Sequence, residues 1–259
     1  MSKIDIVKIY SQYMDAKQEE NRKERYEGME NYYHASGAGM CSRKLYYQSI
    51  EKAEETNQPN AKSNRIMRLG TVVHNDFEEA FSLYNNNIYN KLIYNNNKES
   101  KKKNNIKEKQ IEMLYENEVI IDELNVRGFY DLVTKGEEVY LYDVKTIGSW
   151  PWKYKVAKGG TGSDNHKLQL ATYGIAINED LGRLDGMFLL YYNKDNSDMR
   201  EIEVPLGMLE QAKTYWKNLR KEHVAGLPNF KLGSSPVEIW NCSYCNYYDH
   251  CNPPYTRKK

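Results

Sequence analysis

The sequence of 259 residues lacks the features that mark membrane-spanning, secreted or strongly charged proteins. No run of about 18 apolar residues occurs, so we expect no transmembrane helix. The opening segment MSKIDIVKIYSQYMD lacks the basic, apolar and small-residue order of a signal peptide, which makes the cytoplasm the expected location. Lys and Arg total 37 against 36 Asp and Glu, so the net charge is +1 and any anion-binding surface must be local.

Phosphate-binding loops and internal repeats are missing as well. No G-x-x-x-x-G-K-[ST] pattern occurs, and the glycine-rich stretch KGGTGSD at 158–164 lacks the Lys-Ser or Lys-Thr of such a loop. An ATPase is therefore not expected. Apolar residues make up 40% of the chain, which is enough for a globular core.

Cysteine is scarce, and its four positions are unevenly spread. Cys242, Cys245 and Cys251 form a C-x2-C-x5-C pattern, whereas Cys41 lies about 200 residues earlier. Structural disulfides are not expected in a reducing cytosol. Three thiolates are too few for most structural metal sites, so we pair Cys41 with the other three. Such a site requires the N-terminal segment to pack against the C-terminal tail. The residues alone leave zinc, an iron–sulfur cluster and unrelated buried thiols open.

The order of predicted elements indicates an α/β (α+β) fold with a mixed central sheet flanked by helices. Helices are expected over the first 30 residues and at 65–84, 166–178 and 207–224, and strands within 116–146 and at 186–193 and 200–204. Within 116–146, the first strand is expected to end near Val126, Gly128 to break the pattern, and TKGEE to supply a hairpin turn. A loop is expected at 54–64.

The segment NVRGFYDLVTKGEEVYLYDVKTIGSW at 125–150 places charged side chains among apolar strand residues. Side chains alternate along a strand, so Asp143 and Lys145 share a face. A hairpin centred on Glu137 puts Asp131 opposite Asp143, with Cβ atoms about 5 Å apart. Two carboxylates that close repel each other unless a cation lies between them. This predicts a divalent metal beside a lysine, as phosphodiester hydrolysis uses. A surface hairpin with a charged outer face is the alternative.

Residues on the helices before and after the sheet support the metal site. His74 and Glu78 are four apart and share a helix face, where His74 can be a third ligand or a core histidine. Gln169 and Tyr173 are also four apart on one face. Gly128, which has no Cβ, would let its strand bend toward a bound backbone.

These motifs resemble the PD-(D/E)XK nuclease superfamily in its RecB-like branch. GTVVH…E, VRGFYD, YDVKT and QLATY follow the order and spacing of that branch, and Glu118 also fits it. The chain has D-x-K where many relatives have E-x-K. The resemblance implies three kinds of site residue: the metal ligands His74, Asp131, Asp143 and the carbonyl of Val144, the catalytic Lys145, and the following motif of Gln169 and Tyr173.

The activity implied by this resemblance is that of a metal-dependent DNA exonuclease on single-stranded ends, often with 5′→3′ polarity. Carboxylates, a carbonyl and an imidazole suit Mn²⁺ or Mg²⁺, and the histidine favours Mn²⁺. One alternative is a catalytically weak subunit that binds DNA ends in a recombination or CRISPR adaptation complex. Another is a zinc or iron–sulfur protein without nuclease chemistry. The expected setting is a prokaryotic or phage-infected cell, and a homo-oligomer is also considered.

The cysteines resemble those of CRISPR-associated RecB-like exonucleases and AddB-type helicase–nucleases. In those proteins, one cysteine before the nuclease core and three after it bind a [4Fe–4S] cluster. The resemblance implies such a cluster here, with Zn²⁺ as the alternative. It also suggests three parts: an N-terminal helical segment at 1–64, a nuclease core at 65–226 with an Asn/Lys-rich insert at 85–109, and a cysteine-rich tail at 227–259.

Exposed aromatic residues would offer faces on which unpaired bases stack. The candidates are Tyr46, Tyr47, Trp150 and Trp152, for which packing in the core is the alternative. The insert at 85–109 is expected to be a solvated loop, with a flap that contacts DNA as the less favoured interpretation.

Overall fold

The structure is a computed structural model that describes residues 5–26, 31–85, 111–231 and 239–251. Nearly all of the Asn/Lys-rich insert predicted at 85–109 lies outside these residues. The chain divides into two compact units. Unit 1 comprises residues 1–69, 121–127 and 213–259, and unit 2 comprises residues 70–120 and 128–212.

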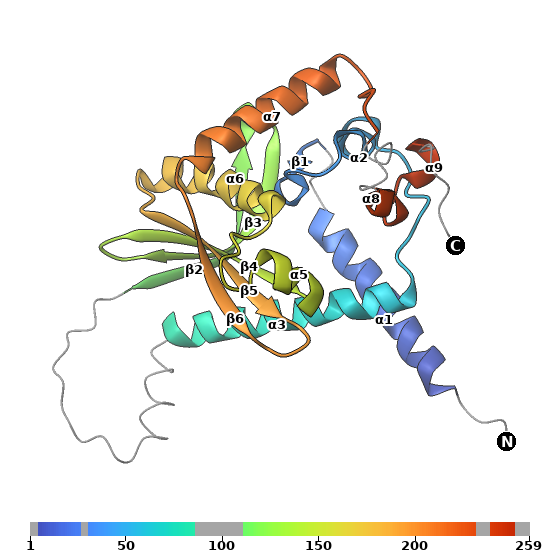
Figure 1. The fold of residues 1–259 in the computed structure, drawn as a ribbon, viewed down its shortest axis with the longest axis horizontal. Coiled ribbons are helices and arrows are strands. Elements are labelled where there is room, and N and C mark those ends of the chain that lie inside the picture. Colours follow the sequence, from blue (N-terminus) through green and yellow to red (C-terminus); the bar gives the residue numbers. More distant parts are fainter. Residues whose placement is uncertain (1–4, 27–30, 86–110, 232–238, 252–259) are drawn as a thin grey trace. The chain divides into compact units, whose positions relative to one another are not determined.

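A mixed β-sheet forms the centre of unit 2 (Figure 1). Its strands are β2 (Glu112–Ile121), β3 (Val126–Lys135), β4 (Val139–Ile147), β5 (Gly186–Asn193) and β6 (Met199–Val204). They run in the order β3-β4-β5-β6, and β2 pairs with β3. The pairs β3–β4 and β5–β6 are antiparallel, whereas β4–β5 is parallel. The predicted mixed α/β fold is therefore confirmed.

Helix α6 (Asp164–Leu181) covers the sheet by packing against β4 and β5. Its residues from Leu170 to Ile177 are all buried, as expected for a helix in the middle of a core. In β4 and β5, Leu141 and Leu189 are fully buried as well. Burial of such side chains stabilises the unit by about 1.5–3 kcal/mol each.

A short helix, α5 (Ser149–Lys155), joins β4 to α6 and was not predicted. Its sequence SWPWKYK contains a proline and three aromatic residues in seven positions, which gives no helical period. Pro151 lies in the first turn, where the missing N–H has no partner to lose.

Two predicted boundaries were wrong. The first strand ends at Ile121, not near Val126, because a 3-10 turn at Asp122–Leu124 follows it. Asn125 closes that turn with a φ of 56°, a conformation that Asn tolerates better than most residues. Gly128 then lies buried inside β3 and does not break it. Similarly, α3 (Ala61–Asn85) begins within the loop expected at 54–64.

Unit 1 combines segments from both ends of the chain. It contains α1 (Ile6–Tyr26), β1 (Tyr33–His34), α2 (Ser42–Tyr46), most of α7 (Met208–Val224), α8 (Ile239–Ser243) and α9 (Tyr248–Cys251). The N–H of Thr56 donates to the carbonyl of Asn246 at 2.9 Å, and the rings of Tyr47 and Tyr247 stack at 6.1 Å. The predicted packing of the N-terminal segment against the C-terminal tail is confirmed. No helix in the described ranges combines the length and apolarity needed to cross a bilayer.

Candidate active site

The β3–β4 hairpin has the register that the sequence predicted. Its pairs run from Lys135 with Val139 to Leu132 with Tyr142, so the hairpin is centred on Glu137. The next position along the same register sets Asp131 against Asp143. The hairpin therefore places two carboxylates side by side in unit 2.

Asp143 is a buried carboxylate, with 1% of its surface exposed. Its Oδ2 lies 2.6 Å from the Nζ of Lys145 but makes no hydrogen bond of normal geometry. Its Oδ1 lies 3.5 Å from the amide nitrogen of Gln169, at the long limit for a hydrogen bond. Burial raises the pKa of Asp143 to about 6, against the lowering effect of Lys145 and with a further rise from Asp131. A second cation nearby would therefore stabilise the charged form of Asp143.

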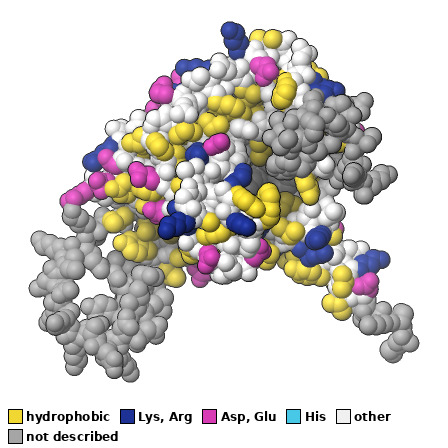
Figure 2. All heavy atoms as spheres, in the orientation of Figure 1, with side chains coloured by type: hydrophobic (Ala, Val, Ile, Leu, Met, Phe, Trp, Pro, Cys, Tyr) yellow, Lys and Arg dark blue, Asp and Glu magenta, His cyan; other side chains and the backbone are white. Residues whose placement is uncertain are grey.

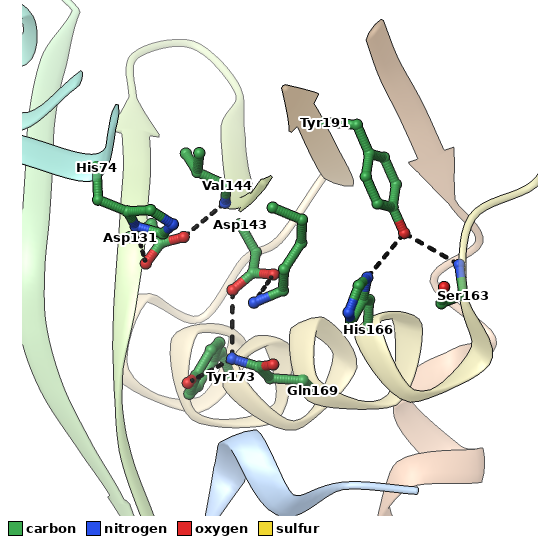
Figure 3. A network of polar contacts seen from close by, with 10 residues as sticks. His74, Asp131, Asp143, Val144, Ser163, His166, Gln169, Tyr173 and Tyr191 are labelled. Atoms are coloured by element: carbon green, nitrogen blue, oxygen red, sulfur yellow. Dashed lines mark hydrogen bonds and ion pairs between the residues drawn. The ribbon is translucent and has the colours of Figure 1, made fainter. Parts of the chain in front are cut away.

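Asp131 is oriented by contacts to both of its oxygens (Figure 3). The backbone N–H of Val144 donates to Oδ2 at 2.5 Å, and Nδ1 of His74 lies 3.7 Å from Oδ1. Val144 thus contacts the site through its N–H in this structure. The predicted role of the Val144 carbonyl as a metal ligand stays a prediction.

Gly70 lets α3 bring His74 to the sheet. It lies one turn before His74, and a Cβ there would come within 2.8 Å of Oγ1 of Thr146 in β4. Real Cβ atoms do not approach another atom this closely, so a side chain at this position would push the helix or Thr146 away. The helix–strand approach that places His74 beside Asp131 therefore depends on a residue without Cβ.

His74, Glu116 and Asp131 form a group of potential metal ligands whose donor atoms all lie within 4.8 Å of one another. Glu116 was missed from the sequence, and Glu118, which was selected, is not part of this group. Glu116 has a φ of 49°, which interrupts the regular alternation of β2. Strand periodicity alone therefore gives the wrong side-chain direction here.

This set of donors fits a hard divalent cation. Two carboxylates and an imidazole form the group, and the buried Oδ2 of Asp143, which has no hydrogen bond, lies on the neighbouring strand. Oxygen ligands with one imidazole suit Mn²⁺ or Mg²⁺ better than softer metals. The residues present are thus consistent with the metal chemistry expected from the motifs.

Gln169 and Tyr173 lie on one face of α6, as their spacing predicted. The amide nitrogen of Gln169 donates to the hydroxyl of Tyr173 at 3.0 Å and faces Asp143. In Figure 3 both side chains point from α6 toward the carboxylate. Gln169 thus links Asp143 of β4 to Tyr173 of α6.

A second polar group, not found from the sequence, lies one turn earlier on α6. The N–H of Ser163 donates to the hydroxyl oxygen of Tyr191 at 3.0 Å, and that hydroxyl lies 2.9 Å from Nδ1 of His166. The Tyr191 hydroxyl can donate to Nδ1 of His166 or accept from it, depending on the tautomer of the imidazole. Burial lowers the pKa of His166 to about 3, and the charges of Lys145 and Lys155 lower it further, so this imidazole is neutral. The sequence feature that could have pointed to His166 is its position three residues before Gln169, on the same face of α6.

The four cysteines lie in unit 1 and are all partly exposed and free of disulfides. Burial raises the pKa of Cys245, and the neighbouring Cys41 and Cys242 contribute to that rise. The guanidinium of Arg43, two residues after Cys41, interacts electrostatically with Cys251, which raises the pKa of Arg43. In the described part of the chain, no three Sγ atoms lie within 4.8 Å of one another.

The predicted stacking residues differ in their surroundings. Tyr47 is buried against Tyr247, and Tyr46 meets Tyr47 edge-on, so both are packing residues of unit 1. Trp152 is half-buried, whereas Trp150 is largely exposed in unit 2.

Comparison with known proteins gives one matching family model and several solved structures of similar fold. The family model described as the PD-(D/E)XK nuclease superfamily matches residues 33–252. The crystal structure of SSO0001 is similar, with 18% identity and a TM-score of 0.56 over 97% of this chain and 99% of that chain. An alkaline exonuclease from Laribacter hongkongensis has 13% identity and a TM-score of 0.45 over 79% of this chain and 94% of its own. No curated protein is significantly similar in sequence.

Proposed function

The chain belongs to the PD-(D/E)XK nuclease superfamily, and from this premise we propose that it is a metal-dependent DNA exonuclease that acts on single-stranded ends. The observation that carries the proposal is the buried Asp143, paired with Lys145 and set in register against Asp131. Burying a carboxylate is costly unless a positive charge compensates it. Lys145 compensates the negative charge of Asp143 in part, and a divalent cation would compensate the rest.

The residues that would hold the cation come from three elements. His74 belongs to α3, Glu116 to β2, and Asp131 and Asp143 to the hairpin. A divalent cation in such a site supplies Lewis acidity, which lowers the pKa of a water molecule and offsets the charge of a phosphate.

The other residues of the site supply a positive charge and hold Asp143 in place. Lys145 presents a fixed ammonium beside Asp143, where it can hold a non-bridging phosphate oxygen or an attacking water. Gln169 contacts Asp143 and is itself held by the hydroxyl of Tyr173. Because Asp143 and Tyr173 are buried, their contacts are made in a water-poor environment where electrostatic interactions are strong.

The preference for single-stranded ends and the 5′→3′ polarity rest on the resemblance to RecB-like nucleases. The test is cleavage of single-stranded DNA carrying a label at either end, with Mn²⁺, by wild type and Lys145→Ala. Lys135→Ala is the matched control, since Lys135 lies on the same hairpin and is half-exposed in a loose pair with Glu112. We expect stepwise shortening that only Lys145→Ala abolishes. Folded wild type that binds ends without cutting them would instead support the DNA-end-binding role.

For the cysteines, we propose a [4Fe–4S] cluster held by Cys41, Cys242, Cys245 and Cys251. The proposal rests on the resemblance of the one-plus-three cysteine arrangement to that of RecB-like nucleases, and all four cysteines lie in unit 1 without disulfides. Iron, sulfide and zinc analysis of anaerobically purified protein tests this. One equivalent of zinc without iron would overturn it.

A further inference from the structure

Helix α5 presents two large aromatic side chains to solvent in the unit that contains the active site. Trp150 is 74% exposed and Tyr154 is 63% exposed. They are four residues apart on one helix face, and their ring centroids lie 5.1 Å apart with the planes at 57°. The Nζ of Lys153 lies 5.4 Å from the centroid of the Tyr154 ring. A paired and exposed Trp and Tyr form a ready-made surface for a flat apolar ligand.

The helix that carries these rings is anchored at both ends. At its start, the N–H of Ser149 donates to a carboxylate oxygen of Asp195 at 2.6 Å. At its end, Arg200 of β6 donates to the carbonyls of Val156 and Ala157, the latter at 2.6 Å. Val156 itself is fully buried. The rings are therefore exposed on a fixed support, which lowers the entropic cost of binding a ligand.

The chain segment that carries the rings is basic, although the chain as a whole carries a net charge of only +1. Residues 144–163 include four lysines and no Asp or Glu. Three of these lysines, Lys153, Lys155 and Lys158, are exposed on or just after α5. In Figure 2, hydrophobic and Lys/Arg side chains lie next to one another over the region where Figure 1 draws α5. Such a surface suits a polyanion with apolar faces.

The aromatic surface is continuous with the candidate active site along the chain. Only Gly148 separates α5 from β4, the strand that carries Asp143 and Lys145. The charges of Lys145 and Lys155 both act on His166, so the basic side of α5 and the catalytic lysine share a neighbour. Helix α5 therefore begins directly at the end of the strand that carries the carboxylates.

We propose that Trp150 and Tyr154 form a base-stacking platform on which the enzyme holds the unpaired strand of its DNA substrate, with Lys153, Lys155 and Lys158 contacting the phosphates. This inference rests on the proposed nuclease function and adds the surface that selects an unpaired strand. Bases of a duplex are already stacked on each other, so only a single strand offers free faces to the two rings.

The test is equilibrium binding of a fluorescent single-stranded oligothymidine in EDTA, where cleavage cannot occur, measured by anisotropy. We expect Trp150→Ala with Tyr154→Ala to weaken binding at least about 10-fold, since each stacked base contributes roughly 1–3 kcal/mol. Trp150→Phe with Tyr154→Phe keeps two rings and should bind within about 3-fold of wild type. Phe230→Ala, which removes a 66% exposed ring from unit 1, is the control for loss of an exposed aromatic.

Binding of an oligonucleotide that lacks bases distinguishes the contribution of stacking from the contribution of charge. The double alanine variant should bind it as wild type does, whereas Lys153→Ala with Lys155→Ala should weaken both oligonucleotides and reduce the salt dependence. Equal binding of oligothymidine by wild type and the double alanine variant overturns the platform. So does a loss of self-association in that variant with DNA binding unchanged, because the rings would then serve a protein interface.

Hydrolysis of bis(p-nitrophenyl) phosphate with Mn²⁺ shows whether a negative result contradicts the stacking platform or the nuclease proposal. This small diester has no bases to stack, so the double alanine variant should hydrolyse it at the wild-type rate. Wild type that binds oligothymidine through the rings but hydrolyses neither the diester nor DNA would contradict the nuclease proposal and leave the platform standing.

Discussion

The ammonium of Lys145 lies 2.6 Å from an oxygen of Asp143 that makes no hydrogen bond of normal geometry. The two side chains leave β4 on the same face, two residues apart, so the strand itself fixes their separation. A buried carboxylate with one incomplete partner is poorly stabilised in its charged form, which explains why its pKa is raised to about 6. The same environment makes the carboxylate a strong attractor for a divalent cation.

Replacing Asp143 by Asn should abolish cleavage without unfolding the protein. We expect activity with Mn²⁺ to fall by more than the roughly 10- to 100-fold that loss of a ligand's supporting partner costs. Thermal unfolding at pH 8 should occur no lower than in wild type, because the substitution removes a charge that burial disfavours. Cleavage at the wild-type rate would show that the site is assigned to the wrong carboxylate.

Glu116 and Glu118 provide a matched pair for the third carboxylate. Only Glu116 lies with His74 and Asp131, within 4.8 Å between donor atoms. We expect Glu116→Gln to raise the Mn²⁺ concentration needed for half-maximal cleavage by about 10-fold or more, and Glu118→Gln to leave it unchanged. A metal titration of both variants decides whether Glu116 or Glu118 is the ligand. The opposite result would restore Glu118, the residue that sequence resemblance selected.

Gly70→Ala should lower activity although alanine favours the helix by about 1 kcal/mol. The new Cβ would meet Oγ1 of Thr146 at 2.8 Å and displace the turn that carries His74. A displacement of about 1 Å can cost up to 100-fold in rate. Thr146→Ala combined with Gly70→Ala removes the clash, so kcat/KM should recover in the double variant. If the single variant is fully active, α3 does not need this close approach.

His166 should make stability depend on pH in a defined window. Its pKa is about 3 in the folded protein and 6.5 when unfolded, so the unfolded chain binds more protons between these values. The free energy of unfolding therefore falls as the pH drops below 6.5, by up to about 1.4 kcal/mol per pH unit from this group.

Asp143 acts in the opposite direction between pH 3.8 and about 6, because its folded-state pKa is raised. A comparison of variants separates the two effects. His166→Gln can still accept from Tyr191 but does not titrate, and its denaturation curves in EDTA should lose the His166 contribution. Parallel profiles for wild type and His166→Gln between pH 4 and 6 would contradict a neutral, buried His166.

The parts of the site that the sequence predicted correctly depend on local rules. The register that sets Asp131 against Asp143 follows from alternation and one turn, and the shared face of Gln169 and Tyr173 follows from helical spacing. Predictions from strand alternation are wrong where one residue interrupts the strand geometry. Glu116 does so in β2 through its positive φ.

Within unit 2, the contact between His166 and Tyr191 could not be predicted from sequence patterns. His166 meets Tyr191 across 25 residues, and nothing in either segment signals the other. Helix α5 was missed because seven residues with a proline carry too little periodicity, although its Trp150 was singled out as a candidate stacking residue. These features are set by packing of the whole unit, which overrides local preference.

The joining of residues 41–57 to residues 242–251 in unit 1 has a consequence for synthesis on the ribosome. Unit 2 draws all its residues from 70–212, so its sheet can assemble while the chain is still being made. Unit 1 must wait until Asn246 and Tyr247 have left the exit tunnel. During that interval the N-terminal segment can already pair with residues 121–127, as Tyr33 does with Val126, but Cys41 lacks the three C-terminal cysteines and stays open to other thiols and metals in the cell.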